Sequence, residues 1–168
     1  TPLPSSAASA VYKRQSMYYD EDQWAIGGIQ KTGQWDTNLE EVWHVVSAGW
    51  YEVYPKYFGN KESMLHEAMD KARGGKFVEV PSKYPKSAWY TYNDKGCSYE
   101  CQAHEYFYWI LMANINALNL SYTDKCSPND EWNICNRFDI KKMDILAYEL
   151  LNNYDFIFPT KIPNGEYK

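Results

Sequence analysis

The chain is poor in basic residues and histidine, and it has no long hydrophobic run. Its 168 residues include 17 Lys and Arg, 22 Asp and Glu and three His, which gives a net charge of −5. Nucleic-acid binding depends on clustered Lys and Arg that neutralise phosphates, so we expect no nucleic-acid partner. No apolar run approaches the roughly 18 residues that a membrane-spanning helix needs, so we expect no membrane span.

Common catalytic and metal-binding motifs are also missing from the sequence. There is no GxSxG nucleophile motif and no phosphate-binding P-loop. The four cysteines lack the CxxC spacing of a zinc knuckle. Four cysteines allow three disulfide connectivities, and we expect the local pairs Cys97–Cys101 and Cys126–Cys135, since short loops close most easily. Disulfides would indicate an oxidising, extracellular location.

Residues 5–15 (SSAASAVYKRQ) resemble the in-frame translation of a transposon-type sequencing adapter, which has Asp where this chain has Ala10. Segments of this kind are left out of fold reasoning. We therefore expect a non-native leader over 1–15, a loop leading into the domain over 16–36, and one helical domain over 37–168. On this interpretation the sequence is metagenomic, and the native N-terminal part is cut away near Ser16.

Hydrophobic periodicity predicts a mainly α fold, with helices over 37–48, 60–73, 98–119 and 143–152. The third helix is apolar on nearly every side from 106 to 113, which is typical of a buried central helix. Two short β-prone runs, 77–80 and 88–92, predict a small β component whose size is limited by nearby prolines. The expected architecture is a single compact helical domain around the central helix.

The first helix has clear signals at both ends. Thr37 and Glu40 form a capping box at its beginning, and Gly49 is a natural stop at its end. Leu39, Val42/Trp43 and Val46 recur at helical spacing, and Leu39, Val42 and Val46 are expected to face the core.

Aromatic residues are abundant, at 17% of the chain, with 16 Tyr and seven Trp. Such side chains bury large apolar areas while keeping a polar group, so an aromatic core is the simpler interpretation. Exposed Tyr and Trp that stack on a glycan are the alternative.

The segment EEVWH in the first helix is the main candidate for chemistry. It has the HExxH layout of zinc peptidases with Glu40 in place of the first His, and Glu40 and His44 then share one helical face. Glu41 and His44 also have the ExxH spacing of carboxylate-bridged metal sites. We predict Glu41, His44 and Glu105, the last on the central helix, as metal ligands, with zinc as the ion. Glu40 or His104 would act as the polarising group or base.

Other interpretations of these residues stay open. Glu40 is already explained by the capping box, and Glu105 could be a surface residue or a buried carboxyl that binds Tyr or Trp without a metal. His104, Glu105 and Tyr108 form only an incomplete second HExxH. His66 has acidic neighbours at i−4 and i+4, so we expect it on a solvated charged face.

Three segments carry a family resemblance: AMDKARGGKF (68–77), YPKSAWYTY (84–92) and ECQAHEYFYW (100–109). They resemble a loose group of uncharacterised secreted microbial proteins, and the resemblance covers most of residues 24–168. Members of the group carry an EHxxH-type first helix at the position of EEVWH. The resemblance implies a His/His/Glu site in the group and a Glu/His/Glu site here, with a carboxylate in place of one imidazole.

Two functions from different classes are consistent with these patterns. The first is an extracellular helical domain with a divalent-metal site, acting as a metal-dependent hydrolase. The second is a non-catalytic secreted binding or structural module that uses exposed Tyr and Trp to bind a glycan or a protein. The difference between them is whether Glu41, His44 and Glu105 converge.

Overall fold

The computed structural model describes residues 37–118, 126–127 and 130–162. The predictions for the leader and for the loop before the domain lie outside these residues. The structure describes the backbone of Thr37 but not its side chain, so the capping box stays a prediction. The described residues form six helices: α3 (Thr37–Val53), α4 (Pro55–Phe58), α5 (Met64–Arg73), α6 (Tyr99–Asn114), α7 (Arg137–Met143) and α8 (Ile145–Leu151). The mainly α, compact fold predicted from the sequence is confirmed.

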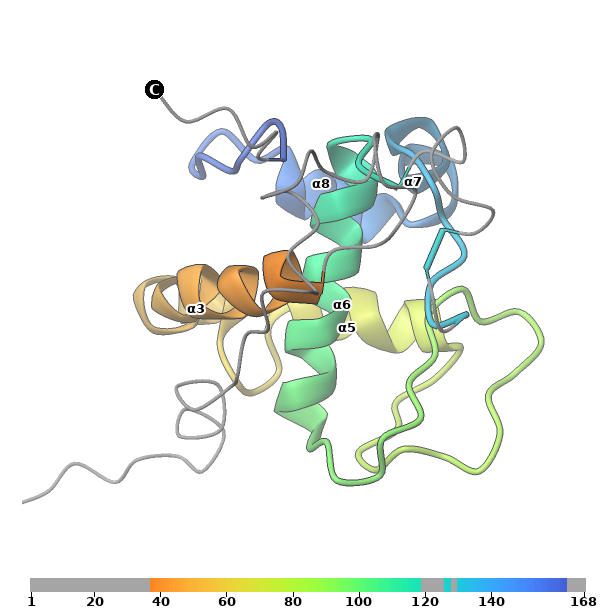
Figure 1. Ribbon diagram of the computed structural model, residues 1–168. Helices are drawn as coiled ribbons and strands as arrows, with labels where there is room; N and C mark the ends of the chain where they lie inside the picture. Colours follow the sequence, from red (N-terminus) through yellow and green to blue (C-terminus); the bar gives the residue numbers. More distant parts are fainter. Residues whose placement is uncertain (1–36, 119–125, 128–129, 163–168) are drawn as a thin grey trace, which may run out of the picture.

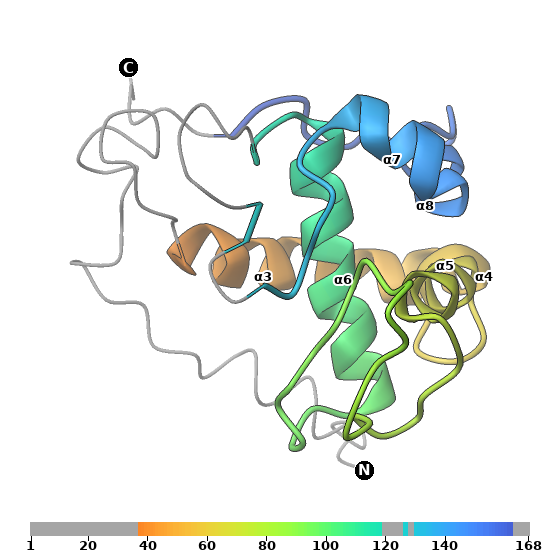
Figure 2. The ribbon, with the colours of Figure 1, turned by 90° about the vertical axis from the view of Figure 1, so that its right-hand side faces the viewer.

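Helix α6 is the centre of the fold (Figures 1 and 2). It packs against α3, α5, α7 and α8, and every residue from Gln102 to Asn114 is buried. The Ser98 side chain caps its N-terminus by accepting from the Cys101 amide. The helix ends at Asn114, earlier than predicted, because the chain turns at Asn116, which has a φ of 59°. The prediction of a buried central helix is confirmed.

Helix α3 is longer than predicted, because it continues through Gly49 to Val53. A glycine inside a helix costs about 1 kcal/mol relative to alanine. Burial of Tyr51 and packing of Trp50 against the core outweigh that cost.

The predicted core face of α3 is wrong for Val42 and Val46, whereas Leu39 packs against the core as predicted. Val42 and Val46 are 41% and 54% exposed, whereas Trp43 is 4% exposed. The Trp43 ring packs edge-on against Phe107 of α6, with ring centroids 5.3 Å apart. A large aromatic side chain buries more apolar area than a valine, so it decides which side of the helix turns inward.

Helix α5 begins later than predicted and ends where predicted. Its N-cap is Ser63 rather than Asn60, and the Ser63 side chain accepts from the His66 amide. At its end Gly74 has a φ of 77°, and a Cβ there would lie 2.9 Å from the Pro85 ring. Both the left-handed backbone and the close approach require glycine.

The helix predicted over 143–152 is α8, which begins slightly later, at Ile145, and the sequence analysis missed α7, which meets α8 at Asp144. The Asp144 carboxylate caps α8 by accepting from the Ala147 amide. It also accepts from the Trp89 indole at 2.8 Å and the Tyr106 hydroxyl at 2.7 Å. These bonds to α6 and to the 89–90 segment fix the chain direction at the junction.

Within the described residues, the β component is reduced to one antiparallel bridge between Tyr90 and Trp132. The two predicted strands do not pair, because the 88–92 run follows α5 instead: the amides of Trp89 and Tyr90 both donate to the Ala72 carbonyl. Disulfides join Cys97 to Cys101 and Cys126 to Cys135, as predicted, with Cα–Cα distances of 5.4 and 4.9 Å.

Aromatic side chains fill the core between α3, α4 and α6. Phe107 is central, with the rings of Trp43, Trp50 and Phe58 at 5.3, 5.8 and 5.0 Å. The prediction that most aromatic residues pack inside is therefore confirmed for the described part of the chain. None of the helices described there has the length and apolar character needed to cross a membrane.

Candidate metal centre

The inward face of α3 carries a row of polar residues. Glu40, His44, Ser47 and Tyr51 are spaced i, i+4, i+7 and i+11, so they lie along one side of the helix. The Ser47 and Tyr51 hydroxyls are 3.1 Å apart and within hydrogen-bonding distance. Glu40 and His44, in the N-terminal part of the row, face α6.

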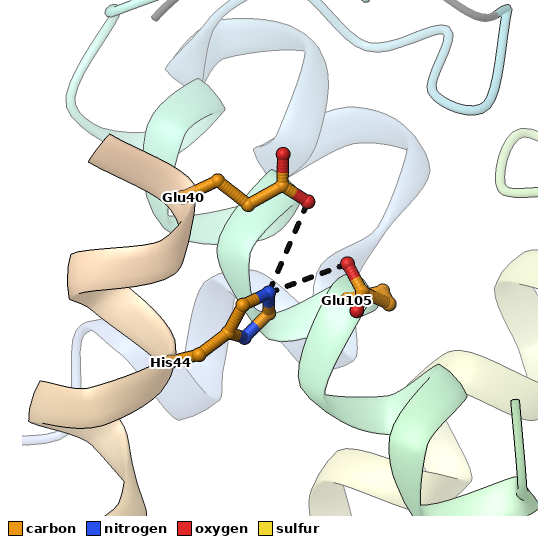
Figure 3. Close-up of side chains that lie close together, drawn as sticks. All are labelled: Glu40, His44 and Glu105. Atoms are coloured by element: carbon orange, nitrogen blue, oxygen red, sulfur yellow. Dashed lines mark ion pairs between the residues drawn. The ribbon is translucent and has the colours of Figure 1, made fainter. Parts of the chain in front are cut away.

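Glu105 meets these two residues from α6 (Figure 3). His44 Nε2 lies 3.4 Å from Glu105 Oε2 and 3.9 Å from Glu40 Oε1. One ligand atom from each residue lies within 4.8 Å of the other two. The side chains of His44 and Glu105 are only 2% and 10% exposed, and that of Glu40 is 20% exposed. Two helices thus bring one imidazole and two carboxylates to a single, largely buried point.

The separations suit ligands around one ion. Zinc binds N and O atoms at about 2.0–2.2 Å, and tetrahedral angles then put two ligand atoms about 3.4 Å apart. The His44–Glu105 distance equals this value. The His44–Glu40 distance exceeds it by about 0.5 Å, which a small side-chain rotation removes.

Comparisons with protein-family models, with curated proteins and with solved structures gave no match to this chain.

Without an ion, His44 and Glu40 both hold their protons more tightly than the free side chains do. Burial alone would lower the pKa of His44, but interactions with Glu105 and Glu40 outweigh it and raise that pKa to about 10. Burial and repulsion from Glu105 raise the pKa of Glu40 to about 7, despite the favourable interaction with His44. At neutral pH one imidazolium therefore faces two carboxylates, and one of these is close to its protonation point. A divalent cation would replace the imidazolium proton and balance both carboxylates.

Of the predicted ligands, His44 and Glu105 converge, and Glu40 completes the group in place of Glu41. Successive helical residues are rotated by about 100°, so Glu41 lies to one side of the row that faces α6. The i, i+4 spacing of Glu40 and His44 matches the HExxH-like alternative in the sequence. The sequence feature that favours Glu40 is its helical spacing with Ser47 and Tyr51, which puts all three on one side of α3. This spacing is hard to recognise in the sequence because the row is polar, whereas helix faces are normally identified from apolar residues.

His104 is buried next to the centre. Its ring stacks on Tyr51, with centroids 4.0 Å apart and an interplanar angle of 5°. Burial lowers the pKa of His104 to about 3, with further lowering by the charge of His44. The imidazole is therefore neutral at pH 7.

His66 does not lie on a solvated face, so that prediction is wrong. It is 2% exposed, its Nδ1 lies 2.9 Å from the Ser63 hydroxyl, and its ring stacks on Tyr99 of α6 at 4.7 Å. Burial lowers the pKa of His66. This side of α5 turns toward α6, so His66 is part of the packing rather than of the metal centre.

Glu131 is a further acidic residue near the centre that sequence reasoning missed. Burial and the charge of Glu40 raise the pKa of Glu131 to about 7, while the Trp109 side chain lowers it. Trp109 follows Glu105 by one helical turn on α6, so Glu131 lies over the side of α6 that carries Glu105. No motif or spacing in the sequence links Glu131 to these residues, because it reaches α6 only through the tertiary fold.

Proposed function

We propose that Glu40, His44 and Glu105 bind one divalent metal ion, and that the ion is zinc. The observation that carries this proposal is the convergence of one imidazole and two carboxylates from two helices, with ligand atoms within 4.8 Å. Imidazole and carboxylate are common zinc ligands, and three protein ligands are the usual number in catalytic zinc sites.

The charges favour a bound ion over a permanent ion pair. Two carboxylates face one buried imidazole, and burial, with a further contribution from the charge of Glu105, raises the pKa of Glu40 to about 7. Burying unbalanced charge costs free energy unless a counter-charge is present. Clusters of this kind are more typical of functional sites than of packing.

We further propose that the protein is a secreted, metal-dependent hydrolase. Three protein ligands leave a position for water, and zinc lowers the pKa of a bound water to about 7, which makes hydroxide available as a nucleophile. Glu40 is a ligand in this proposal. His104, with its pKa of about 3, is poorly matched to general-base catalysis near neutral pH. The two disulfides are consistent with an oxidising compartment.

Metal binding is tested by calorimetric titration of chelator-treated protein with zinc, together with elemental analysis of the dialysed complex. We expect about one zinc per chain. Loss of a second-sphere partner typically weakens metal binding about 10–100-fold, so Glu105→Gln and His44→Gln should each weaken it by more than about 100-fold. Glu67→Gln, at an exposed position of α5, is the matched control and should leave affinity unchanged. Equal zinc binding by the wild type and both ligand variants would refute the proposed site.

Hydrolysis is tested separately on the zinc-loaded protein with a panel of ester, peptide and glycoside substrates. We expect turnover that is lost in Glu105→Gln and restored when zinc is returned to chelator-treated wild type. A zinc-loaded protein that hydrolyses none of these substrates would contradict the hydrolase proposal while leaving the metal site intact.

A further inference from the structure

A groove of about 540 Å³ opens between the 80–95 segment and Glu131. Its volume is within the range of small-ligand sites, about 300–1,000 Å³. The residues that give it its chemical character are Tyr84, Thr91, Tyr92, Asn93, Lys95 and Glu131. The groove thus combines two aromatic rings with hydroxyl, amide and charged groups.

The fold holds this groove beside the metal centre. The Thr91 amide donates to the Glu131 carbonyl at 2.8 Å, next to the bridge between Tyr90 and Trp132. Both bridge residues pack on Tyr106 of α6, with ring centroids at 5.3 and 5.9 Å. Tyr106 directly follows Glu105, and in Figure 2 the segment after residue 130 runs alongside α6. The bridge therefore ties both sides of the groove to the turn of α6 that carries a proposed ligand.

Charge interactions agree with this placement. The pKa of Tyr92 is raised by burial and then by the charges of Glu105, Glu131 and Glu40. Tyr92 is thus close enough to sense two of the proposed ligands as well as the acid on the opposite side of the groove. Glu131 lines the groove and is not among the three residues whose ligand atoms converge. A carboxylate has two acceptor oxygens, so Glu131 can interact with Trp109 and still accept from a ligand in the groove.

The lining indicates which chemistry the groove would accept. Among the groove residues named above, Lys95 is the one cation and Glu131 the one acid, so the groove lacks the clustered positive charge that phosphate or nucleic acid would need. The Tyr84 hydroxyl already donates to the Tyr92 carbonyl at 3.1 Å, so Tyr84 offers its ring rather than its hydroxyl. Rings that bind apolar faces, next to groups that both donate and accept hydrogen bonds, suit a sugar, which has C–H faces and many hydroxyls.

We propose that this groove binds a neutral oligosaccharide, with Tyr92 stacking on a sugar ring and Glu131 accepting from its hydroxyls beside the metal centre. As a substrate site, the groove rests on the proposed metal-dependent hydrolase. Binding of the sugar itself does not depend on that function. Tyr92 and Glu131 are positioning residues here, and the zinc ligands are a separate set.

The proposal is tested by calorimetric titration of the zinc-incubated domain with hexasaccharides of cellulose, xylan, chitin and β-1,3-glucan, and with decaproline as a peptide probe. We expect at least one hexasaccharide to bind. Tyr92→Ala should weaken that binding by at least about tenfold, as loss of a stacking aromatic does, and Glu131→Gln by at least about threefold. Tyr92→Phe, which keeps the ring, should remain within about threefold.

Tyr154→Ala is the matched control, because Tyr154 is fully exposed and does not line the groove. It should leave sugar binding unchanged. If Tyr92→Ala fails to fold, backbone NMR of the wild type replaces it, and sugar should then shift the amides of 91–95 and Glu131. The proposal is overturned if no hexasaccharide binds, if only decaproline binds, or if the shifts and losses fall at Tyr154 instead.

Zinc content measured on the same samples separates this proposal from the metal site. If the protein takes up no zinc on incubation but still binds sugar in a way that depends on Tyr92, the metal centre is refuted and the sugar groove is supported. If the protein binds zinc but no sugar, the metal centre is supported and the sugar groove is refuted. A loss of zinc in Glu131→Gln would show that Glu131 is a metal ligand, and its assignment to the sugar would be wrong.

Discussion

We expect a rise in pH to destabilise the metal-free domain and bound zinc to stabilise it. In the metal-free protein, His44 has a pKa raised to about 10 and Glu40 a pKa raised to about 7, from ordinary values of 6.5 and 4.5. Both groups hold their protons more tightly in the folded state than in the unfolded state. Their full contribution to the free energy of unfolding is therefore present at a pH below their ordinary pKa values. This contribution is lost as the pH rises through the folded-state pKa, about 7 for Glu40 and about 10 for His44.

The loss should be large enough to measure. One pKa unit corresponds to about 1.4 kcal/mol, so raising the pH from 5 to 9 should remove roughly 3 kcal/mol or more of the unfolding free energy contributed by these two groups. The direction is unusual for a carboxylate, since acids that are paired in the folded state normally stabilise as pH rises. It follows from the burial of Glu40 beside a second acid.

Zinc should oppose this loss, because the ion displaces the His44 proton. Affinity should therefore rise about tenfold per pH unit between pH 7 and 9. Zinc at 100 times its Kd stabilises the folded state by about 2.7 kcal/mol, which for a domain of this size raises Tm by roughly 5–11 °C.

The assay is calorimetric unfolding at pH 6, 7, 8 and 9, at one free zinc concentration and with chelator. The Tm increase caused by zinc should grow with pH in the wild type and vanish in His44→Gln. A zinc effect that is independent of pH, or that persists in His44→Gln, would show that zinc does not compete with the His44 proton.

Three further predictions concern the fold. Asp144→Ala should cost about 3–5 kcal/mol, since it leaves buried ring donors and a helix cap without their acceptor; urea unfolding measures this, and a cost under about 1 kcal/mol would contradict the role given to Asp144. Val46→Thr should change stability by less than about 0.5 kcal/mol, whereas Trp43→Ala should cost about 3–5 kcal/mol; the reverse order would restore the valine face as the buried one. Replacing Cys97 and Cys101 together by serine should cost about 2 kcal/mol, the value for a short loop, and a loss of folding would show that this disulfide does more than close it.

The central helix and the disulfides could be predicted because their signals are local. A run that is apolar on nearly every side can only be buried, and short cysteine spacings favour local pairing. The junction at Asp144 could not be predicted in this way. The position of this junction depends on hydrogen bonds that Trp89 and Tyr106 donate to the Asp144 carboxylate, and both donors are distant from Asp144 in the sequence.

The candidate site was predictable in part. Spacing alone placed His44 on a helix with acidic neighbours, and the burial pattern of α6 singled out Glu105. The choice between Glu40 and Glu41 depended on which side of α3 turns inward, and the packing of Trp43 on Phe107 decides that. Periodicity put Val42 and Val46 on the core side together with Leu39, because it does not weigh one large aromatic residue against several smaller residues.

Glu131 marks the limit of sequence reasoning here. Its position follows from the bridge between Tyr90 and Trp132 and from the packing of both rings on Tyr106. Contacts between segments so far apart in the sequence leave no spacing pattern. Such residues are found only from the tertiary structure.

The most direct test of the metal centre is a crystal structure of the zinc-soaked protein with diffraction recorded on both sides of the zinc absorption edge. We predict one strong anomalous peak about 2.0–2.2 Å from His44 Nε2 and from a carboxylate oxygen of both Glu40 and Glu105. A structure in which His44 and Glu105 keep their direct contact of 3.4 Å, with no anomalous peak between them, would contradict the central claim.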